Sequence, residues 1–145
     1  MKEVYILRGP SGSGKSTWIA ENHESALVCS SDHFFMVDGE YQFDISKLSM
    51  NHSLCFKKFI DAILKGVETV IVDNTNIFKW QYESYAVLAE KFGYQVTLVE
   101  LMPVTIEELR TVVARNAHGV PQSTVCQMVL DFETDCSYTT LKRGI

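Results

Sequence analysis

The sequence lacks the features of several large classes of protein. No apolar run approaches the ~20 residues that a helix needs to cross a bilayer, and the first residues lack the long apolar stretch of a signal peptide. The four cysteines stand singly, without a C-x-x-C pair, and no histidine lies at zinc-finger spacing. These absences predict a cytoplasmic protein with buried free thiols and neither a disulfide framework nor a structural metal.

Charge and composition exclude further classes. A net charge of −5 provides no excess of Lys and Arg with which to coat nucleic acid, although it allows one strand end to be held by a few local contacts. A content of 46% hydrophobic and 21% charged residues excludes a disordered chain. At 145 residues, the chain is expected to form a single domain over 1–145.

Short apolar runs alternate with helical patterns along the chain. The expected strands are rich in β-branched or aromatic residues and cover 4–7, 26–29, 67–72 and 94–102. Apolar residues at helical spacing predict helices over 15–22, 46–65, 80–92, 105–114 and 123–133. This alternation predicts a three-layer α/β/α fold with a mainly parallel sheet of about four to five strands.

A glycine-rich loop follows the first expected strand. Residues 9–16 read GPSGSGKS and match G-x-x-x-x-G-K-[ST], the Walker A motif of P-loop NTPases, between a strand and a helix. Glycines let successive backbone N–H groups converge on phosphates, and the helix start adds the positive end of its dipole. The motif predicts binding of ATP and Mg²⁺ by Gly9, Ser11, Gly12, Ser13, Gly14, Lys15, Ser16 and Thr17.

Three of these residues have distinct expected roles. Lys15 reaches the β- and γ-phosphates, which also makes it a catalytic candidate, while the Ser16 hydroxyl ligates Mg²⁺. Thr17 is expected to contact the α-phosphate.

Polar residues follow the second and third expected strands, at the edge of a parallel sheet where ligands gather. Asp32 is a candidate general base for an attacking hydroxyl, the alternatives being a helix cap or a contact to metal-bound water. Asp73 ends the run V-I-V and is expected either to hold Mg²⁺ through water or only to form its own turn. Asn74 and Asn76 are candidates for orienting the acceptor or for shaping the same turn.

The segment at about 105–122 is a candidate lid. It carries Arg110, Arg115 and His118 on or just after a helix, and Gly119 allows a bend. An arginine that closes over the phosphates offsets the charge developing on the transferred group. Arg115 is the candidate nearest the bend, and the alternative for it is a solvated helix face.

Taken together, these motifs resemble one family. The order GPSGSGKSTW, SSDHFF, VIVDNTNI and ARNAHGVP is similar to the P-loop kinases that include the 5′-hydroxyl kinase domain of phage-type polynucleotide kinase. It is also similar to the P-loop domain of certain ubiquitin-ligase-binding proteins. The resemblance implies a nucleoside-kinase-like fold with Lys15 and Ser16 at the nucleotide and metal, Asp32 as general base and Arg115 as lid arginine.

Two positions depart from the phage-type pattern. Phe35 stands where those kinases place an arginine that grips the acceptor's phosphate, and His118 stands where they place a second lid arginine. Phe34, Phe35 and Trp80 are expected either to stack on a base of the substrate or to pack in the core.

Three functions therefore stay open. The first is a kinase acting on the 5′-hydroxyl of a polynucleotide, which the resemblance favours. The second is a kinase of a small hydroxylated metabolite, nucleoside or antibiotic, which the acidic charge and the missing acceptor arginine favour. The third is a non-enzymatic nucleotide-binding interaction module.

Overall fold

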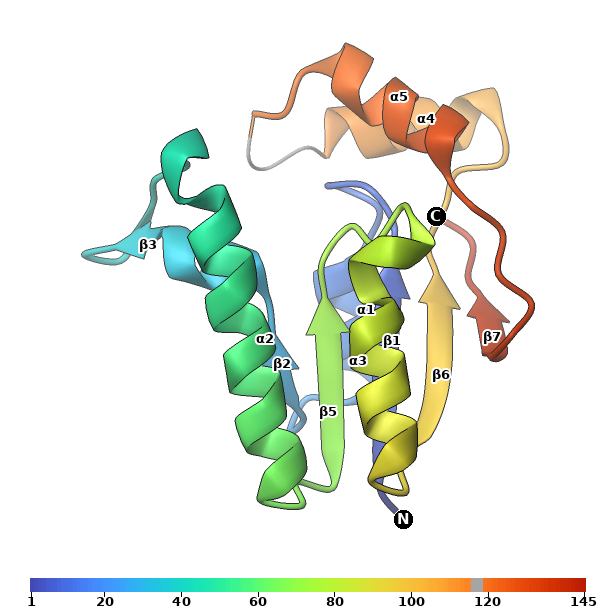
Figure 1. The fold of residues 1–145 in the computed structure, drawn as a ribbon. Helices are drawn as coiled ribbons and strands as arrows, with labels where there is room; N and C mark the ends of the chain where they lie inside the picture. The colour runs from blue at the N-terminus through green and yellow to red at the C-terminus, as the bar shows by residue number, and fades with distance from the viewer. Residues whose placement is uncertain (116–118) are drawn as a thin grey trace.

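The computed structural model describes residues 1–115 and 119–145 and is built on a parallel sheet (Figure 1). Strand β1 (Glu3–Arg8) lies at its centre, flanked by β5 (Thr69–Asp73) and β6 (Gln95–Glu100), with β2 (Leu27–Cys29) and β7 (Thr139–Lys142) at the edges. All pairings within this five-stranded sheet are parallel. Every carboxyl end therefore points to the same edge.

Helices cover both faces of the sheet. In Figure 1, α1 (Lys15–Asn22) lies behind the sheet, and α2 (Leu48–Leu64) and α3 (Lys79–Lys91) lie in front of it. The remaining helices, α4 (Ile106–Ala114) and α5 (Gln122–Asp131), lie above the carboxyl ends of the strands. The expected three-layer α/β/α fold is confirmed. No helix in the described ranges is both long and apolar enough to span a bilayer.

The central strand shows how the sheet buries both faces. Val4 and Ile6 pack in the cluster formed with α2 and α3, whereas Leu7 packs in the cluster that contains Trp18 of α1. Successive side chains of a strand point to opposite faces, so a central strand of this sheet is apolar at nearly every position. This is why residues 4–7 read as a continuous apolar run.

A small hairpin stands outside the main sheet. A 3₁₀ helix, η1 (Ser31–Phe35), leads into β3 (Met36–Val37) and β4 (Glu40–Tyr41), and η2 (Ile45–Lys47) follows. Asp38 and Gly39 form the turn with φ of 50° and 82°, and Asp-Gly with two positive φ angles is typical of a tight hairpin. The strands expected from the sequence did not include this hairpin.

The fifth strand of the sheet, β7, was also not predicted. Its side chains are mostly exposed, and it pairs with β6 at the edge of the sheet. A short edge strand need not be apolar on both faces, so its sequence carries little strand signal.

All four cysteines are free, but only two of them are buried. Cys29 and Cys55 are buried as expected, and burial raises the pKa of the Cys29 thiol to about 12. Cys126 and Cys136 are exposed, so the expectation of burial is wrong for this pair.

Candidate functional site

A cavity of about 540 Å³ opens at the carboxyl edge of the sheet, and we call it the P-loop cavity. Residues distant in the sequence meet there because the parallel strands all end at this edge. The predicted site residues that line it are Ser11, Gly12, Gly14, Lys15, Ser16, Thr17, Asp32, Asp73, Asn74 and Arg115. The cavity is also lined by five residues for which the sequence predicted no role in a site, namely Ser30, His33, Met36, Tyr41 and Thr75.

The glycine-rich loop takes up the backbone conformation that its sequence predicts. Gly12 and Gly14 have φ of 85° and 98°, in the left-handed region that side chains disfavour. Helix α1 begins at Lys15 without a side-chain cap. The N–H groups of its first turn are therefore available to an anion in the cavity, where the helix dipole also favours negative charge.

Gly9 anchors the start of the loop. Its N–H donates to the Thr75 carbonyl oxygen at 2.9 Å. A Cβ at this position would collide with the Leu101 carbonyl oxygen and lie 2.7 Å from Ser13 Oγ. Neighbouring backbone cannot yield as a flexible side chain can, so the loop fits only glycine here.

We expect Gly9→Ala to lower the free energy of unfolding by about 1–3 kcal/mol, because the added methyl group overpacks fixed backbone. Thermal unfolding followed by circular dichroism measures the change. Gly144→Ala is the control, because a Cβ there meets nothing within 4 Å. Equal melting temperatures for the two variants would contradict the close approach at Gly9.

Lys15 is the cation of the loop. In this structure its Nζ donates to the carbonyl oxygens of Gly9 and Pro10 at 2.8 and 3.1 Å. Burial lowers the pKa of Lys15, while the carboxylates of Asp73 and Asp32 act in the opposite direction. The ammonium group therefore lies within electrostatic range of both predicted acidic residues.

Asp73 has the properties expected of a group that holds a metal indirectly. Burial raises the pKa of its carboxyl group, and Lys15 opposes that shift. Its Oδ1 is buried and has no hydrogen-bond partner in the described part of the chain. Because a buried oxygen without a partner is costly, this atom suits a metal-bound water, and the Ser16 hydroxyl lines the same cavity.

The acidic and polar side chains of the cavity suit a magnesium ion held by few protein groups better than an ion held by a full set of protein ligands. Within residues 1–115 and 119–145, no group of three or more His, Cys, Asp and Glu side chains converges to hold a metal ion. Magnesium usually keeps several waters and is held by one or two carboxylates together with phosphates of the substrate. Ser16 and Asp73 are compatible with that arrangement.

Asp32 is positioned by hydrogen bonds to the residue that caps η1 and between η1 and the loop after β5. Its N–H donates to Ser30 Oγ at 3.3 Å. The N–H and the hydroxyl of Ser31 both donate to Asn74 Oδ1, at 2.9 and 2.8 Å. The Tyr41 hydroxyl contacts Asp32 Oδ1 at 3.5 Å. Asn74 therefore ties the segment that carries Asp32 to the end of β5, and the hairpin brings Tyr41 beside it.

Two of the expected substrate contacts are corrected by the structure. Phe35 is 1% exposed, does not line the P-loop cavity and packs against Phe43 with ring centroids 5.0 Å apart. Asn76 is 2% exposed, has a φ of 47°, and donates from Nδ2 to the Leu7 carbonyl oxygen at 2.8 Å. For each residue the structure agrees with the other role that the sequence had left open: Phe35 packs in the core, and Asn76 shapes the turn.

Arg8 is a buried residue for which the sequence predicted no role. Its Nε donates to the Asn76 carbonyl oxygen at 2.8 Å, and its Nη2 donates to those of Ile77 and Glu133 at 3.0 and 2.8 Å. It also lies over the rings of Tyr82 and Phe132. This side chain joins the loop after β5 to the segment after α5. An arginine ending an apolar strand gives no sequence signal of such a role.

Arg115 reaches the P-loop cavity from the end of α4. A Cβ on Gly14 would lie 3.9 Å from Arg115 Nη1, so the guanidinium group lies close to the start of α1. His118 lies outside the described residues. Whether this histidine replaces a second lid arginine therefore stays a prediction from the sequence.

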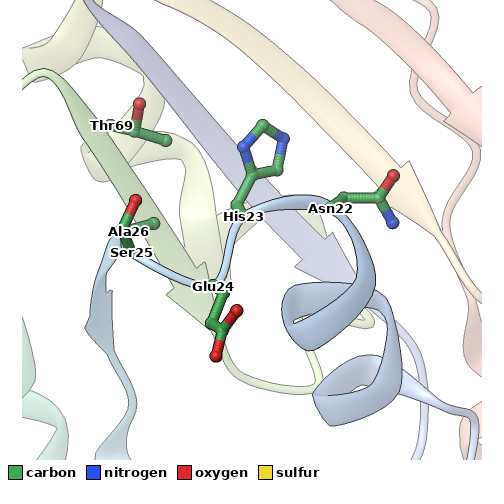
Figure 2. Close-up of a pocket in the computed structure, with 6 residues that line it drawn as sticks. All are labelled: Asn22, His23, Glu24, Ser25, Ala26 and Thr69. Carbon is green, nitrogen blue, oxygen red and sulfur yellow. The ribbon is translucent and has the colours of Figure 1, made fainter.

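Another pocket, of about 520 Å³, lies at the opposite, amino-terminal edge of the sheet. Figure 2 shows that its side chains do not converge: His23, Asn22 and Glu24 point in different directions. The His23 ring packs against Tyr5, with centroids 4.4 Å apart. This pocket lacks a convergent set of reactive groups, and the P-loop cavity is the candidate site.

A five-stranded parallel sheet with a glycine-rich phosphate loop after its central strand defines a P-loop, kinase-like α/β domain. The chain belongs to the family described as AAA domain, whose model matches residues 4–134. It is 30% identical over 133 residues to human NEDD4-binding protein 2, which covers 90% of this chain. The chain spans only 8% of the length of that human protein.

Solved structures of kinases share the fold. A sugar kinase from Janibacter sp. HTCC2649 matches with a TM-score of 0.66 and 19% identity, over 99% of this chain and 86% of that chain. A gluconokinase from Sinorhizobium meliloti 1021 matches with a TM-score of 0.58 and 17% identity, over 98% and 82%. The resemblance to P-loop kinase-like proteins is thus confirmed at the level of family and fold, whereas none of these three proteins is named a polynucleotide kinase.

Proposed function

We propose that the protein is a kinase that uses ATP and Mg²⁺ to phosphorylate a hydroxyl group, with the 5′-hydroxyl of a polynucleotide as the first candidate acceptor. One observation carries the proposal. A single cavity contains the phosphate loop, a carboxylate and a hydroxyl suited to magnesium, an accessible second carboxylate and an arginine. Phosphoryl transfer requires these elements together, because its catalysis consists mainly of positioning and charge stabilisation.

Each of these residues has a role in the proposed reaction. Lys15 and the N–H groups at the start of α1 hold the phosphates, and Ser16 and Asp73 are the residues that would hold Mg²⁺. When bound there, Mg²⁺ would neutralise part of the phosphate charge. Asp32 accepts the proton as the acceptor oxygen bonds to the γ-phosphorus and the bond to the ADP oxygen breaks. Arg115 stabilises charge on the transferred group.

We expect Arg115→Ala to lower kcat by about 10²-fold while weakening ATP affinity much less, because the arginine acts mainly on charge that develops during transfer. Steady-state kinetics and calorimetry with Mg·ATP separate the two effects. Arg110→Ala is the matched control, since Arg110 is exposed on the same helix and does not line the cavity. Equal losses of affinity and turnover in Arg115→Ala would argue against a role in transfer.

The acceptor is identified by supplying labelled ATP with 5′-hydroxyl oligonucleotides or with a panel of sugars and nucleosides. Label in the oligonucleotide supports the first candidate. Label only in small molecules supports the second candidate, a small-molecule kinase, which the absence of an arginine at Phe35 favours. Retained ATP binding without transfer to any hydroxyl would support the third candidate, a non-enzymatic nucleotide-binding module.

A further inference from the structure

A second cavity adjoins the P-loop cavity. It has a volume of about 520 Å³ and lies between the amino-terminal halves of α2 and α3, so we call it the α2–α3 cavity. Asn74 and Thr75, directly after β5, line both cavities. A ligand in the α2–α3 cavity would therefore lie next to the cavity that Asp32 and the phosphate loop line.

The α2–α3 cavity is also lined by a titratable side chain, His52 of α2. Burial lowers the pKa of His52, and the negative charge of Asp32 acts in the opposite direction. The side chains of the two cavities are thus within electrostatic range of each other. A molecule that spans them can place a hydroxyl at Asp32 while its remaining part occupies the second cavity.

Both helices contribute aromatic rings to the α2–α3 cavity. Phe56, Tyr85 and Trp80 all line it. Phe56 and Tyr85 pack edge to face, with centroids 4.9 Å apart, as in a core. Trp80 differs, because it is 73% exposed. The core-packing alternative for Trp80 is therefore wrong, and a large aromatic surface faces solvent beside the candidate site.

Trp80 is supported as a flat surface. Its ring lies 6.4 Å from that of Phe78, centroid to centroid, with only 14° between the ring planes. It stands in the first turn of α3, next to Gln81, whose Oε1 accepts a hydrogen bond from Phe78 N at 3.0 Å. An exposed ring of this kind stacks well on planar ligands, since stacking on aromatic side chains contributes ~1–3 kcal/mol per nucleobase.

The cavity is also neutral. Among the described residues, no Lys, Arg, Asp or Glu lines it, and its polar side chains include Ser49, Gln81 and Ser84. Such a surface offers hydrogen bonds to a polar edge but no charge to hold a phosphate. The first nucleoside of a 5′-hydroxyl strand suits an uncharged lining, because it carries no charge before the first internucleotide phosphate.

We propose that the α2–α3 cavity binds the nucleobase of the acceptor, stacked on Trp80, so that the 5′-hydroxyl of the same nucleoside reaches Asp32. This inference rests on the proposed kinase function and specifies its acceptor as a nucleoside end, either free or at the start of a strand. A sugar without a base would leave the exposed ring of Trp80 unused.

Kinetics of the whole chain test this assignment. With a short 5′-hydroxyl oligodeoxyadenylate as acceptor, we expect Trp80→Ala to raise the KM for the oligonucleotide by about tenfold. In Trp80→Phe, which keeps an aromatic ring, we expect the KM to stay close to the wild-type value. The Kd for Mg·ATP stays at the wild-type value in both variants. Phe92→Ala is the matched control, since it removes a half-exposed aromatic ring at the other end of α3. Adenosine as acceptor distinguishes a free nucleoside from a strand end.

Fluorescence provides a readout that does not depend on turnover. The chain has two tryptophans. Trp18 of α1 is buried against the sheet, whereas Trp80 is exposed. Binding of oligodeoxyadenylate is expected to quench wild-type emission, and the quenching is lost in Trp80→Phe. Gluconate, which has no ring to stack, leaves the emission unchanged.

The outcomes separate this inference from the kinase function. If the wild-type protein phosphorylates the oligonucleotide or adenosine, an unchanged acceptor KM in Trp80→Ala overturns the base site and leaves the kinase function standing. If no hydroxyl is phosphorylated, the kinase function fails, and the quenching alone decides: quenching that depends on Trp80 supports a nucleobase site, and its absence overturns it.

Discussion

Replacing Lys15 with alanine is expected to abolish detectable Mg·ATP binding and to lower kcat/KM by about 10³-fold or more. Lys15 lines the P-loop cavity at the start of α1, and its Nζ already lies beside the carbonyl oxygens of Gly9 and Pro10. In the proposed reaction, its charge acts on the phosphates both before and during transfer. Affinity and turnover are therefore expected to fall together.

The matched control for this change is Lys65→Ala. Lys65 is exposed at the end of α2 and pairs with Asp61 at 2.9 Å, far along the chain from the phosphate loop. Its loss should leave ATP affinity and turnover at wild-type values, because exposed ion pairs contribute little. Calorimetry measures the affinity directly. Full ATP binding by a folded Lys15→Ala variant would remove the basis for placing the nucleotide in this loop.

Asp32→Asn is expected to behave differently, lowering kcat by about 10²- to 10⁴-fold while ATP binding is retained. The amide keeps the shape of the side chain but cannot accept a proton from the acceptor hydroxyl. ATP affinity is expected to stay the same or rise slightly, because a negative charge facing the same cavity as the phosphates is removed. Single-turnover transfer and calorimetry measure the two quantities.

Asp38→Asn is the control within the same segment. Asp38 is exposed in the hairpin turn with a φ of 50°, a conformation that asparagine also adopts readily. The hairpin should therefore persist, and turnover should be unchanged. Near-normal transfer by Asp32→Asn on the true substrate would mean that another group takes the proton. Loss of biological activity in Lys15→Ala but not in Asp32→Asn would instead favour a nucleotide-binding module.

The predictions that succeeded rest on local chemistry. The loop at Gly12 and Gly14 requires positive φ angles, and the residues around them match a motif whose spacing allows few other structures. The strands around β1 are apolar at successive positions because helices cover both faces of the sheet. Such signals are contained within a few consecutive residues and can be read without knowledge of the partners.

The predictions that failed depended on partners distant in the chain. Phe35 and Asn76 follow strands just as Asp32 and Asn74 do, yet the former two are enclosed by the hairpin and by β1. Trp80 stands on a helix whose other aromatic residues are buried, and its own pattern did not distinguish exposure from core packing. Whether a polar or aromatic residue near a strand end faces the cavity depends on which element packs over it.

The sequence by itself determined the nucleotide-binding loop, the alternation of strands and helices and the acidic residues at the strand ends, because each follows from the conformational or chemical preference of a short segment. Only the tertiary structure decided which of those residues share a cavity, that Arg8 joins the loop after β5 to the segment after α5, and that a neutral aromatic cavity opens between α2 and α3. These are contacts between segments far apart in the chain, so they follow from how the helices pack on the sheet and not from any one segment.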